Sequence, residues 1–281
     1  MRKYNGVHYD LDIRSQTVKL RPEYNNQLLS NETGSFNGFK KFGGSSIGNI
    51  FETDPFKGKF LAFLHMARLA MPVFKQKYVR AGEAVEPKIF DALRKQTKIE
   101  DIQHIVAKDV GYDYFKDKHS IVGGVPDGLI PSKKIVLEMK SVQSKKRDLW
   151  IKDNGMNLPL DYRKQAELYA YLLGYDKYVI VAAFLEENDY FDPQNINIFE
   201  RHIESFAFSV DPNRSKDDLQ KIIDFYNHYS RTGVSPIYDA RRDAMVVEYL
   251  ACRNEEEWFN LFTKWKALGE IDEDIEFSKV R

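Results

Sequence analysis

The spacing of apolar residues along the chain predicts strands and helices in alternation. Apolar and polar residues alternate over residues 7–13, which is typical of a half-buried strand. Helical spacing of apolar residues predicts buried helices over 59–71 and 75–97. Pro87 in the second helix is expected to kink it or to begin a new first turn, which would leave Glu86 at an irregular point of the backbone.

The middle of the chain carries the pattern of a sheet. Residues 102–141 look rich in strands, and the apolar run YVIVAAFL at 178–185 is short enough for a buried central strand. The intervening stretch DYRKQAELYAYLLG predicts a helix that ends near Gly174. We therefore expect an α/β fold with a central mixed β-sheet flanked by helices.

The last part of the chain predicts two more helices and a strand pair. Residues 196–210 are expected to form the strand pair, and Ser215 with Asp218 makes a capping-box pattern that predicts the start of the next helix. Three glutamates from residue 255 precede an apolar stripe at helical spacing, and acidic residues in a first turn are favoured by the helix dipole. The triplet is therefore interpreted as structural.

Composition narrows the class of protein. The 281 residues can bury a sizeable core, and we expect one domain over 1–281. The 42 basic and 42 acidic side chains balance, so any surface that binds nucleic acid must be local. The single cysteine, the absence of an apolar signal core and the absence of a membrane-length apolar run predict a soluble, cytoplasmic protein that contacts no membrane.

Three charged residues occur where burial is expected. Side chains alternate faces along a strand, so Glu138 and Lys140 should point the same way, and a hairpin turn near Pro131 would bring Asp127 beside them. Two buried carboxylates raise each other's pKa unless a cation neutralises them, and Mg²⁺ or Mn²⁺ bound there could activate water against a phosphate. The alternative reading of Glu138 and Lys140 is an exposed ion pair on a strand.

Other segments could contact the same ligand. Gln165 and Tyr169 lie four residues apart on one face of the expected helix, with Arg163 and Lys164 just before them. Near the N-terminus, glycines and serines follow Lys40 and Lys41, so backbone N–H groups and positive charge could meet an anion, although such clusters are usually plain loops. No phosphate-loop, zinc-protease or nucleophile-elbow pattern occurs in the sequence.

The ordered combination of these motifs resembles the PD-(D/E)xK nucleases, and among them the YqaJ-type viral recombinase family that includes the phage lambda exonuclease. The residues that carry the resemblance are Pro126–Asp127–Gly128, Glu138–Met139–Lys140 and the helix from Gln165 to Tyr169. Weaker matches are GGSSIGNI at 43–50, RAGEAVEP at 80–87 and TGVSPIYDARRDA at 232–244, so the resemblance extends over roughly residues 40–245. It implies a restriction-endonuclease-like core.

The resemblance also implies roles for these residues. Asp127, Glu138 and the carbonyl of Met139 would bind the metal, Glu86 would be the acid that a helix brings near it, and Lys140 would be the catalytic lysine. Gln165 and Tyr169 would help to place the scissile strand. Ser45 would match a phosphate-contacting serine, while Gly38 holds the position of the family's arginine seven residues earlier.

The implied activity is metal-dependent hydrolysis of DNA from linear duplex ends, in the 5′ to 3′ direction that the family suggests. Lys40, Lys41, Arg163 and Lys164 would contact the DNA. The resemblance further implies a homotrimer and a single-strand annealing protein as a partner. The alternatives are a structure- or sequence-specific endonuclease on the same fold and a non-catalytic DNA-binding module.

Overall fold

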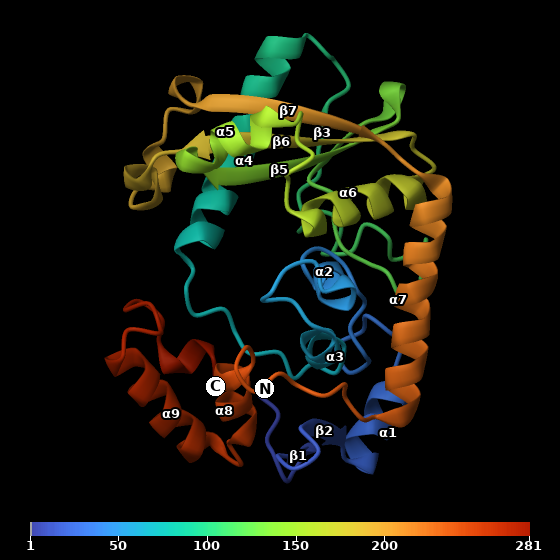
Figure 1. The fold of residues 1–281 in the computed structure, drawn as a ribbon, viewed down its shortest axis with the longest axis vertical. Coiled ribbons are helices and arrows are strands. Elements are labelled where there is room, and N and C mark those ends of the chain that lie inside the picture. The colour runs from blue at the N-terminus through green and yellow to red at the C-terminus, as the bar shows by residue number, and fades with distance from the viewer. Residues whose placement is uncertain (1) are drawn as a thin grey trace.

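The computed structural model describes residues 2–281 and places a five-stranded mixed sheet at one end of an elongated molecule (Figure 1). The sheet has the order β3-β4-β5-β6-β7. Its strands are β3 (Gln103–His104), β4 (Gly128–Ile130), β5 (Ile135–Gln143), β6 (Lys177–Leu185) and β7 (His202–Ser209). Among these strands only β5 and β6 pair in parallel, because α6 (Leu160–Leu173) returns the chain between them.

Two helices sandwich the sheet. Even-numbered residues of β5 and β6, such as Val136 and Ile180, pack in one hydrophobic cluster with Ala166 of α6. Odd-numbered residues, such as Leu137, pack in a second cluster with Phe90 of α4 (Lys77–Thr97). Apolar residues thus occupy both faces of the sheet, which explains why β6 reads as a continuous apolar run.

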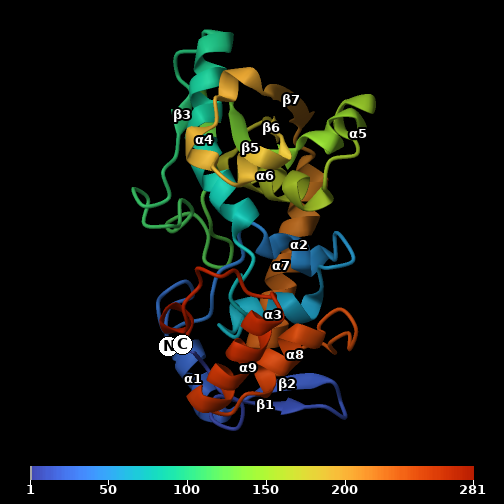
Figure 2. The same ribbon diagram turned by 90° about the vertical axis from the view of Figure 1, so that its left-hand side faces the viewer.

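The other end of the molecule is mainly helical. It contains a hairpin of β1 (Tyr9–Asp12) and β2 (Thr17–Leu20) and lies beside the long helix α7 (Pro212–Thr232), which spans both ends (Figures 1 and 2). The remaining helices are α1 (Pro22–Ser30), α2 (Ser46–Phe51), α3 (Lys59–Met66), α5 (Arg147–Lys152), α7 (Pro212–Thr232), α8 (Ala244–Ala251) and α9 (Glu255–Ala267). No helix within residues 2–281 combines the length and apolar character needed to cross a membrane.

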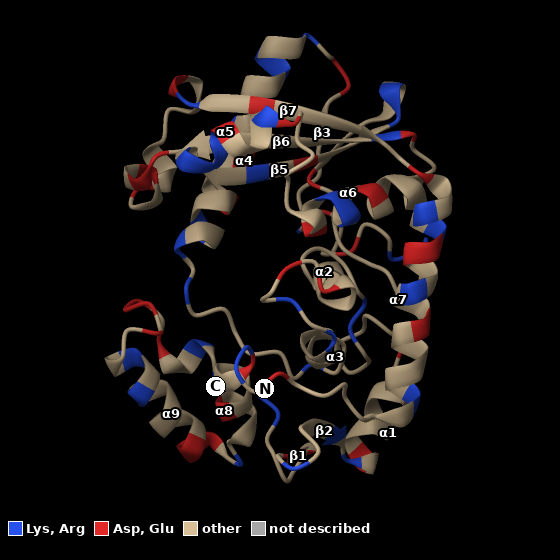
Figure 3. Ribbon diagram, in the orientation of Figure 1, with Lys and Arg blue, Asp and Glu red and all other residues tan. Residues whose placement is uncertain are grey.

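Charged residues are distributed over the whole molecule. Basic and acidic residues are interspersed at both ends and along α7 (Figure 3), in keeping with the 42 basic and 42 acidic side chains of the sequence. A site for a phosphate must therefore be sought in the local surroundings of particular cavities rather than in the overall charge.

Several predicted boundaries are wrong. The first strand is shorter than 7–13, because Val7 and Ile13 are exposed outside the pairing of β1 with β2. The helix expected over 59–71 ends at Met66, and Arg68 just beyond it has a left-handed backbone with φ 60°. Pro87 begins no new helix, since α4 continues unbroken from Lys77 to Thr97 and carries Glu86 on regular helical backbone.

The predictions for residues 102–141 and 196–210 also contain more strand than the structure has. Within 102–141 only β3, β4 and β5 are strands, and residues 105–127 run as loops and turns. Within 196–210 only β7 is a strand, because Ile198–Glu200 makes a short 3₁₀ turn in place of a second strand, following a first such turn at Pro193–Asn195. Asn197 fixes the second turn by accepting a hydrogen bond from the backbone N–H of Phe199 at 3.3 Å.

The start of α7 corrects a further prediction. Asp211 caps this helix by accepting hydrogen bonds from the backbone N–H groups of Asn213 and Arg214, and Pro212 occupies the first turn. Ser215 and Asp218 therefore lie inside the helix, where both are buried. An Asp–Pro pair is a strong helix start, and it outweighs the capping-box pattern four residues later.

Candidate active site

The short strand β4 creates the site at the edge of β5. Its three residues pair with Leu137, Val136 and Ile135, so no strand within residues 2–281 neighbours β5 on that side from Glu138 onward. Asp127 directly precedes β4, and its Oδ2 accepts a hydrogen bond from the backbone N–H of Met139 at 2.6 Å. A carboxylate thus replaces a missing strand partner, and the predicted approach of Asp127 to Glu138 is present.

Glu138 and Lys140 share one face of β5, as the alternation of the sequence predicts. Lys140 Nζ donates to Glu138 Oε1 at 2.5 Å, and the Nε2 of Gln165 on α6 donates to the same oxygen at 2.7 Å. The Glu138 side chain is 1% exposed, so an exposed ion pair is ruled out here. Its other oxygen, Oε2, is buried and has no hydrogen-bond partner among residues 2–281.

The electrostatics of the three charges follow from burial. Burial and then the charge of Asp127 raise the pKa of Glu138 to about 8, while Lys140 acts in the opposite direction. Burial likewise raises the pKa of Asp127. Although burial alone would lower the pKa of Lys140, Glu138 and Asp127 raise it above the ordinary lysine value. Lys140 is therefore held as a charged ammonium.

A cavity of about 380 Å³ opens beside these residues and is lined by Asp127, Met139, Lys140 and residues of α4 that include Glu86. Burial and the charge of Asp127 raise the pKa of Glu86, and His104 lowers it. Helix α4 thus brings two carboxylates to the cavity beside Asp127, namely Glu83 and the Glu86 that the family resemblance implies.

Two further side chains that contact the site residues Glu86 and Lys140 were not predicted from the sequence. His104 Nε2 lies 2.9 Å from Glu86 Oε1, and its ring stacks on Phe90 at 4.4 Å between centroids. Tyr162 lines the cavity, and Lys140 Nζ lies 4.9 Å from the centre of its ring. A single histidine or a tyrosine in a helix forms no sequence motif that would mark it as part of a site. A prediction that residues 103–104 pair with β4 would, however, have placed His104 next to Asp127.

Tyr169 connects the site to the glycine-rich loop. Its buried hydroxyl accepts a hydrogen bond from the backbone N–H of Gly44 at 2.7 Å. A glycine is needed at position 124 for this contact, because a Cβ atom on residue 124 would lie 2.1 Å from the Tyr169 hydroxyl. The backbone of Gly124 also has a φ of +111°, which favours glycine. The loop therefore packs against the segment that leads into Asp127, where Phe42 bridges Val122.

The predicted phosphate-contacting residues are only partly free to bind a ligand. Ser45 is exposed ahead of α2, and Lys40 lines a separate cavity. Lys41 Nζ lies 2.8 Å from Asp113 Oδ2 and donates to the carbonyl of His119. Arg163 packs on the ring of Phe208 and Lys164 pairs with Asp218 at 2.6 Å. Neither Arg163 nor Lys164 lines the Asp127 cavity.

Protein side chains supply only part of the ligand set that a hard cation needs at this site. Within residues 2–281 no three His, Cys, Asp or Glu side chains are arranged to hold a metal ion by themselves. Mg²⁺, however, is commonly held by one or two carboxylates together with waters and substrate phosphate. The unpartnered Oε2 of buried Glu138 and the neighbouring Asp127 fit that arrangement.

Comparison with known proteins identifies the family. Residues 37–176 match the YqaJ-like viral recombinase domain. This segment belongs to that family. Two uncharacterized relatives, MG373 of Mycoplasma genitalium and its homolog in Mycoplasma pneumoniae, are 27% and 26% identical in alignments 265 residues long that cover 81% of this chain and 91% of each relative.

A solved structure shares the fold of this YqaJ-like chain. A phage-related exonuclease from Haemophilus somnus 129PT aligns with a TM-score of 0.51 and 14% identity over 68% of this chain and 94% of the exonuclease. The five-stranded mixed sheet flanked by helices is accordingly a restriction-endonuclease-like core, which confirms the predicted fold class. The family and the fold together support a nuclease.

Proposed function

We propose that this protein is a divalent-metal-dependent deoxyribonuclease that degrades linear duplex DNA from its ends. The observation that carries the proposal is the buried Glu138 with an unpartnered Oε2, placed beside Asp127 and the Lys140 ammonium at the open edge of β5. The YqaJ-like family supports DNA as the substrate. The 5′ to 3′ direction is proposed from the family resemblance alone.

Asp127 and Glu138 are the proposed metal ligands. A divalent cation held there would polarise the scissile phosphate and lower the pKa of a bound water. The Met139 N–H faces the open edge toward Asp127, and the carbonyl of a strand residue faces the same side, so this carbonyl is the proposed third ligand. Glu86 adds negative charge from α4, and His104 holds its carboxylate in place.

Lys140 acts as a cation in this proposal. Its raised pKa makes it a poor base near neutral pH, so it orients the attacking water and offsets the charge that builds on the phosphate. Gln165 keeps Glu138 fixed through Oε1, which leaves Oε2 for the metal. Tyr169 and Gly44 fix the glycine-rich loop, whose exposed Ser45 would contact the DNA backbone.

The test of the proposed function compares DNA forms in parallel. Linear duplexes with 5′-phosphate or 5′-hydroxyl ends and covalently closed circles are incubated with Mg²⁺, with Mn²⁺ or with a chelator. We expect both linear duplexes to be degraded only with metal, and circles to persist. Cleavage of the circles would instead identify an endonuclease, and binding without cleavage under every condition would identify a DNA-binding module.

Substituting Lys140 with alanine tests the assignment of the cation. We expect Lys140→Ala to lower the single-turnover cleavage rate by about 10²–10³-fold, because charge stabilisation at the phosphate is removed, while DNA affinity changes little. Lys216→Ala is the matched control, because this exposed lysine on α7 has no role in the site. Equal rates for the two variants would remove Lys140 from the mechanism.

A further inference from the structure

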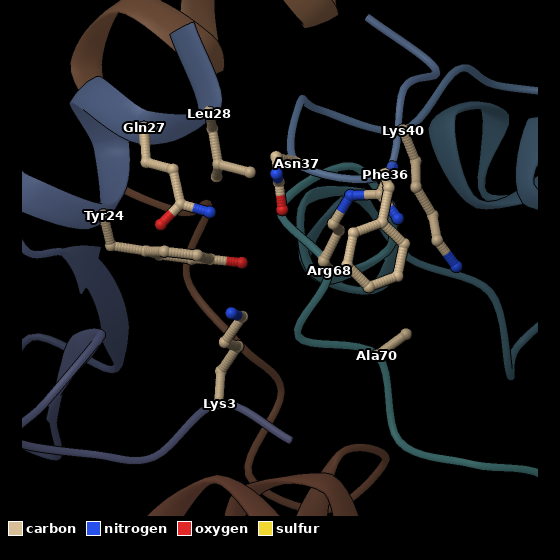
Figure 4. Close-up of a pocket in the computed structure, with 9 residues that line it drawn as sticks. All are labelled: Lys3, Tyr24, Gln27, Leu28, Phe36, Asn37, Lys40, Arg68 and Ala70. Atoms are coloured by element: carbon tan, nitrogen blue, oxygen red, sulfur yellow. The ribbon is translucent and has the colours of Figure 1, made fainter. Parts of the chain in front are cut away.

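A second cavity, of about 230 Å³, lies between the N-terminal segment, α1, the loop that precedes Phe42 and the residues that follow α3 (Figure 4). Three basic side chains line it, Lys3, Lys40 and Arg68, and no acidic side chain of the described residues does. In Figure 4 Lys3 and Lys40 lie on opposite sides of Arg68 and Phe36, and the Tyr24 hydroxyl points toward the space between Lys3 and Arg68. None of these residues lines the Asp127 cavity.

The positive charge in this cavity is not compensated. Among residues 2–281, the ammonium groups of Lys3 and Lys40 have neither an ion pair nor a hydrogen bond, and Lys3 Nζ lies 5.0 Å from the centre of the Tyr24 ring. The Arg68 guanidinium donates to the backbone carbonyls of Gly38 and Ser35, which are neutral. Burial and then the charge of Arg68 lower the pKa of both lysines. An anion in the cavity would offset this repulsion.

A neighbouring cavity does not supply that anion. It shares Lys40 and Arg68 and contains one carboxylate, Asp113. That carboxylate lies 2.8 Å from Lys41 Nζ and also accepts a hydrogen bond from the Gly124 N–H at 3.2 Å. The negative charge of Asp113 is therefore already balanced by Lys41.

The Arg68 guanidinium is held in position by the backbone and can still bind an anion. It follows the end of α3 at a left-handed position, φ 60°, where glycine is usually favoured. Its two carbonyl partners fix the guanidinium while leaving its net charge free. Gln27 and Asn37 also line the cavity, and their side-chain amides have no hydrogen-bond partner among the described residues. The cavity thus offers neutral donors beside three cations.

An exposed aromatic ring borders the same cavity. Phe36 lines it and is 85% exposed, which is unusual for so large an apolar side chain. Cations that bind phosphate next to a free aromatic face are the combination that binds nucleotides, because every base can stack on such a ring.

We propose that this cavity binds the phosphate of a nucleotide through Lys3, Lys40 and Arg68, with the base stacked on Phe36. Lys3 and α1 lie outside residues 37–176, so the cavity is built partly by segments beyond the matched family domain. The ligand is either a free nucleoside monophosphate or a nucleotide of a DNA strand. The proposal does not rest on the cleavage reaction.

The test measures binding in a chelator, so that cleavage plays no part. Inorganic phosphate, a nucleoside 5′-monophosphate, the same nucleoside without phosphate and a short single-stranded oligonucleotide are titrated by calorimetry into the full chain. We expect the monophosphate or the oligonucleotide to bind, and the nucleoside not to. Tighter binding of the oligonucleotide would identify a strand as the ligand, and tighter binding of the monophosphate a free nucleotide.

Variants locate the binding. Lys3→Gln with Lys40→Gln should weaken nucleotide binding at least tenfold and lower the salt dependence for the oligonucleotide, by a slope of about 0.7 for each phosphate that is no longer neutralised. Arg68→Gly should act likewise and suits the left-handed backbone, so folding should persist. Phe36→Ala should weaken nucleotide binding about tenfold but leave inorganic phosphate unaffected.

Lys216→Gln is the control, since it removes a lysine charge from an exposed site on α7. Unchanged nucleotide affinity in the double lysine variant and in Arg68→Gly would overturn the proposal, as would the absence of binding by both nucleotide probes. An unchanged affinity in Phe36→Ala would overturn the stacking. Because every titration lacks divalent metal, failure here and failure of the proposed nuclease activity are separate results.

Discussion

At residue 138 a carboxylate occupies a position where a buried strand usually holds an apolar side chain. Glu138 is 1% exposed, and within residues 2–281 it accepts hydrogen bonds through one oxygen only, from Lys140 and Gln165. A buried acceptor without a partner is costly, and such a cost is common where a ligand binds. The stability of the folded protein should therefore depend on whether a ligand is bound next to the Glu138 carboxylate.

Glu138→Gln should change how stability depends on pH. The pKa of Glu138 rises from 4.5 to about 8 on folding, so between these values the folded state binds more protons than the unfolded state. Stability contributed by this group then decreases as pH rises through that window, by up to about 1.4 kcal/mol per pH unit. We expect the variant to show a shallower decline in unfolding free energy, measured by urea denaturation in a chelator from pH 5 to 8.

Glu273→Gln, an exposed position near the C-terminus, is the control and should keep the wild-type pH profile. Mg²⁺ should reduce the decline in the wild type, because a cation favours the ionised carboxylate. A Glu138→Gln profile parallel to the wild type would show that the carboxyl keeps an ordinary pKa.

For individual residues, strand alternation predicted the core of the site but not its supporting contacts. It placed Glu138 and Lys140 on one face because a strand has a period of two residues. His104 and Tyr162 could not be found in this way, because each meets its partner through tertiary packing. The same holds for Lys41 and Lys164, whose ion pairs with Asp113 and Asp218 join segments far apart in the sequence.

Among helices and strands, long periodic segments were predictable and short ones were not. β6 and α6 follow their apolar patterns, and Gly174 ends α6 in a left-handed conformation as expected. Short helices such as α2 and α5 lack a complete periodic repeat, so tertiary packing decides them. The three-residue β4 is a short element with a large effect, because its end opens the edge of β5.

The start of α7 provides a prediction for a helix. Asp211 accepts hydrogen bonds from two backbone N–H groups, at 3.0 Å and 3.1 Å, whereas the buried Ser215 hydroxyl has no partner among the described residues. Asp211→Ala should therefore lower the unfolding free energy by about 1 kcal/mol, measured by urea denaturation. Ser215→Ala is the matched comparison and should cost nothing. The reverse order would restore the capping box predicted from the sequence.

One hydrophobic cluster joins the two ends of the molecule. It contains Val136 of the sheet and Trp258 of α9, and the two chain termini lie side by side in both views (Figures 1 and 2). Arg2 links the N-terminal segment to the C-terminal helices. Its guanidinium lies 3.9 Å from the ring centre of Tyr249 and 4.4 Å from that of Trp258, and it donates a hydrogen bond to the Tyr249 carbonyl. The N-terminal segment is thus fastened to the C-terminal helices.

Arg2→Ala should destabilise the entire chain rather than loosen one end. Arg2 is 7% exposed, and a desolvated cation above aromatic rings contributes about 2 kcal/mol or more. Because both ends share a hydrophobic cluster, we expect one unfolding transition, displaced to lower urea and followed by both tryptophan fluorescence and far-ultraviolet circular dichroism. Arg14→Ala, at an exposed position between β1 and β2, should leave the transition unchanged. If the fluorescence transition separates from the circular dichroism transition, the C-terminal helices unfold independently of the sheet.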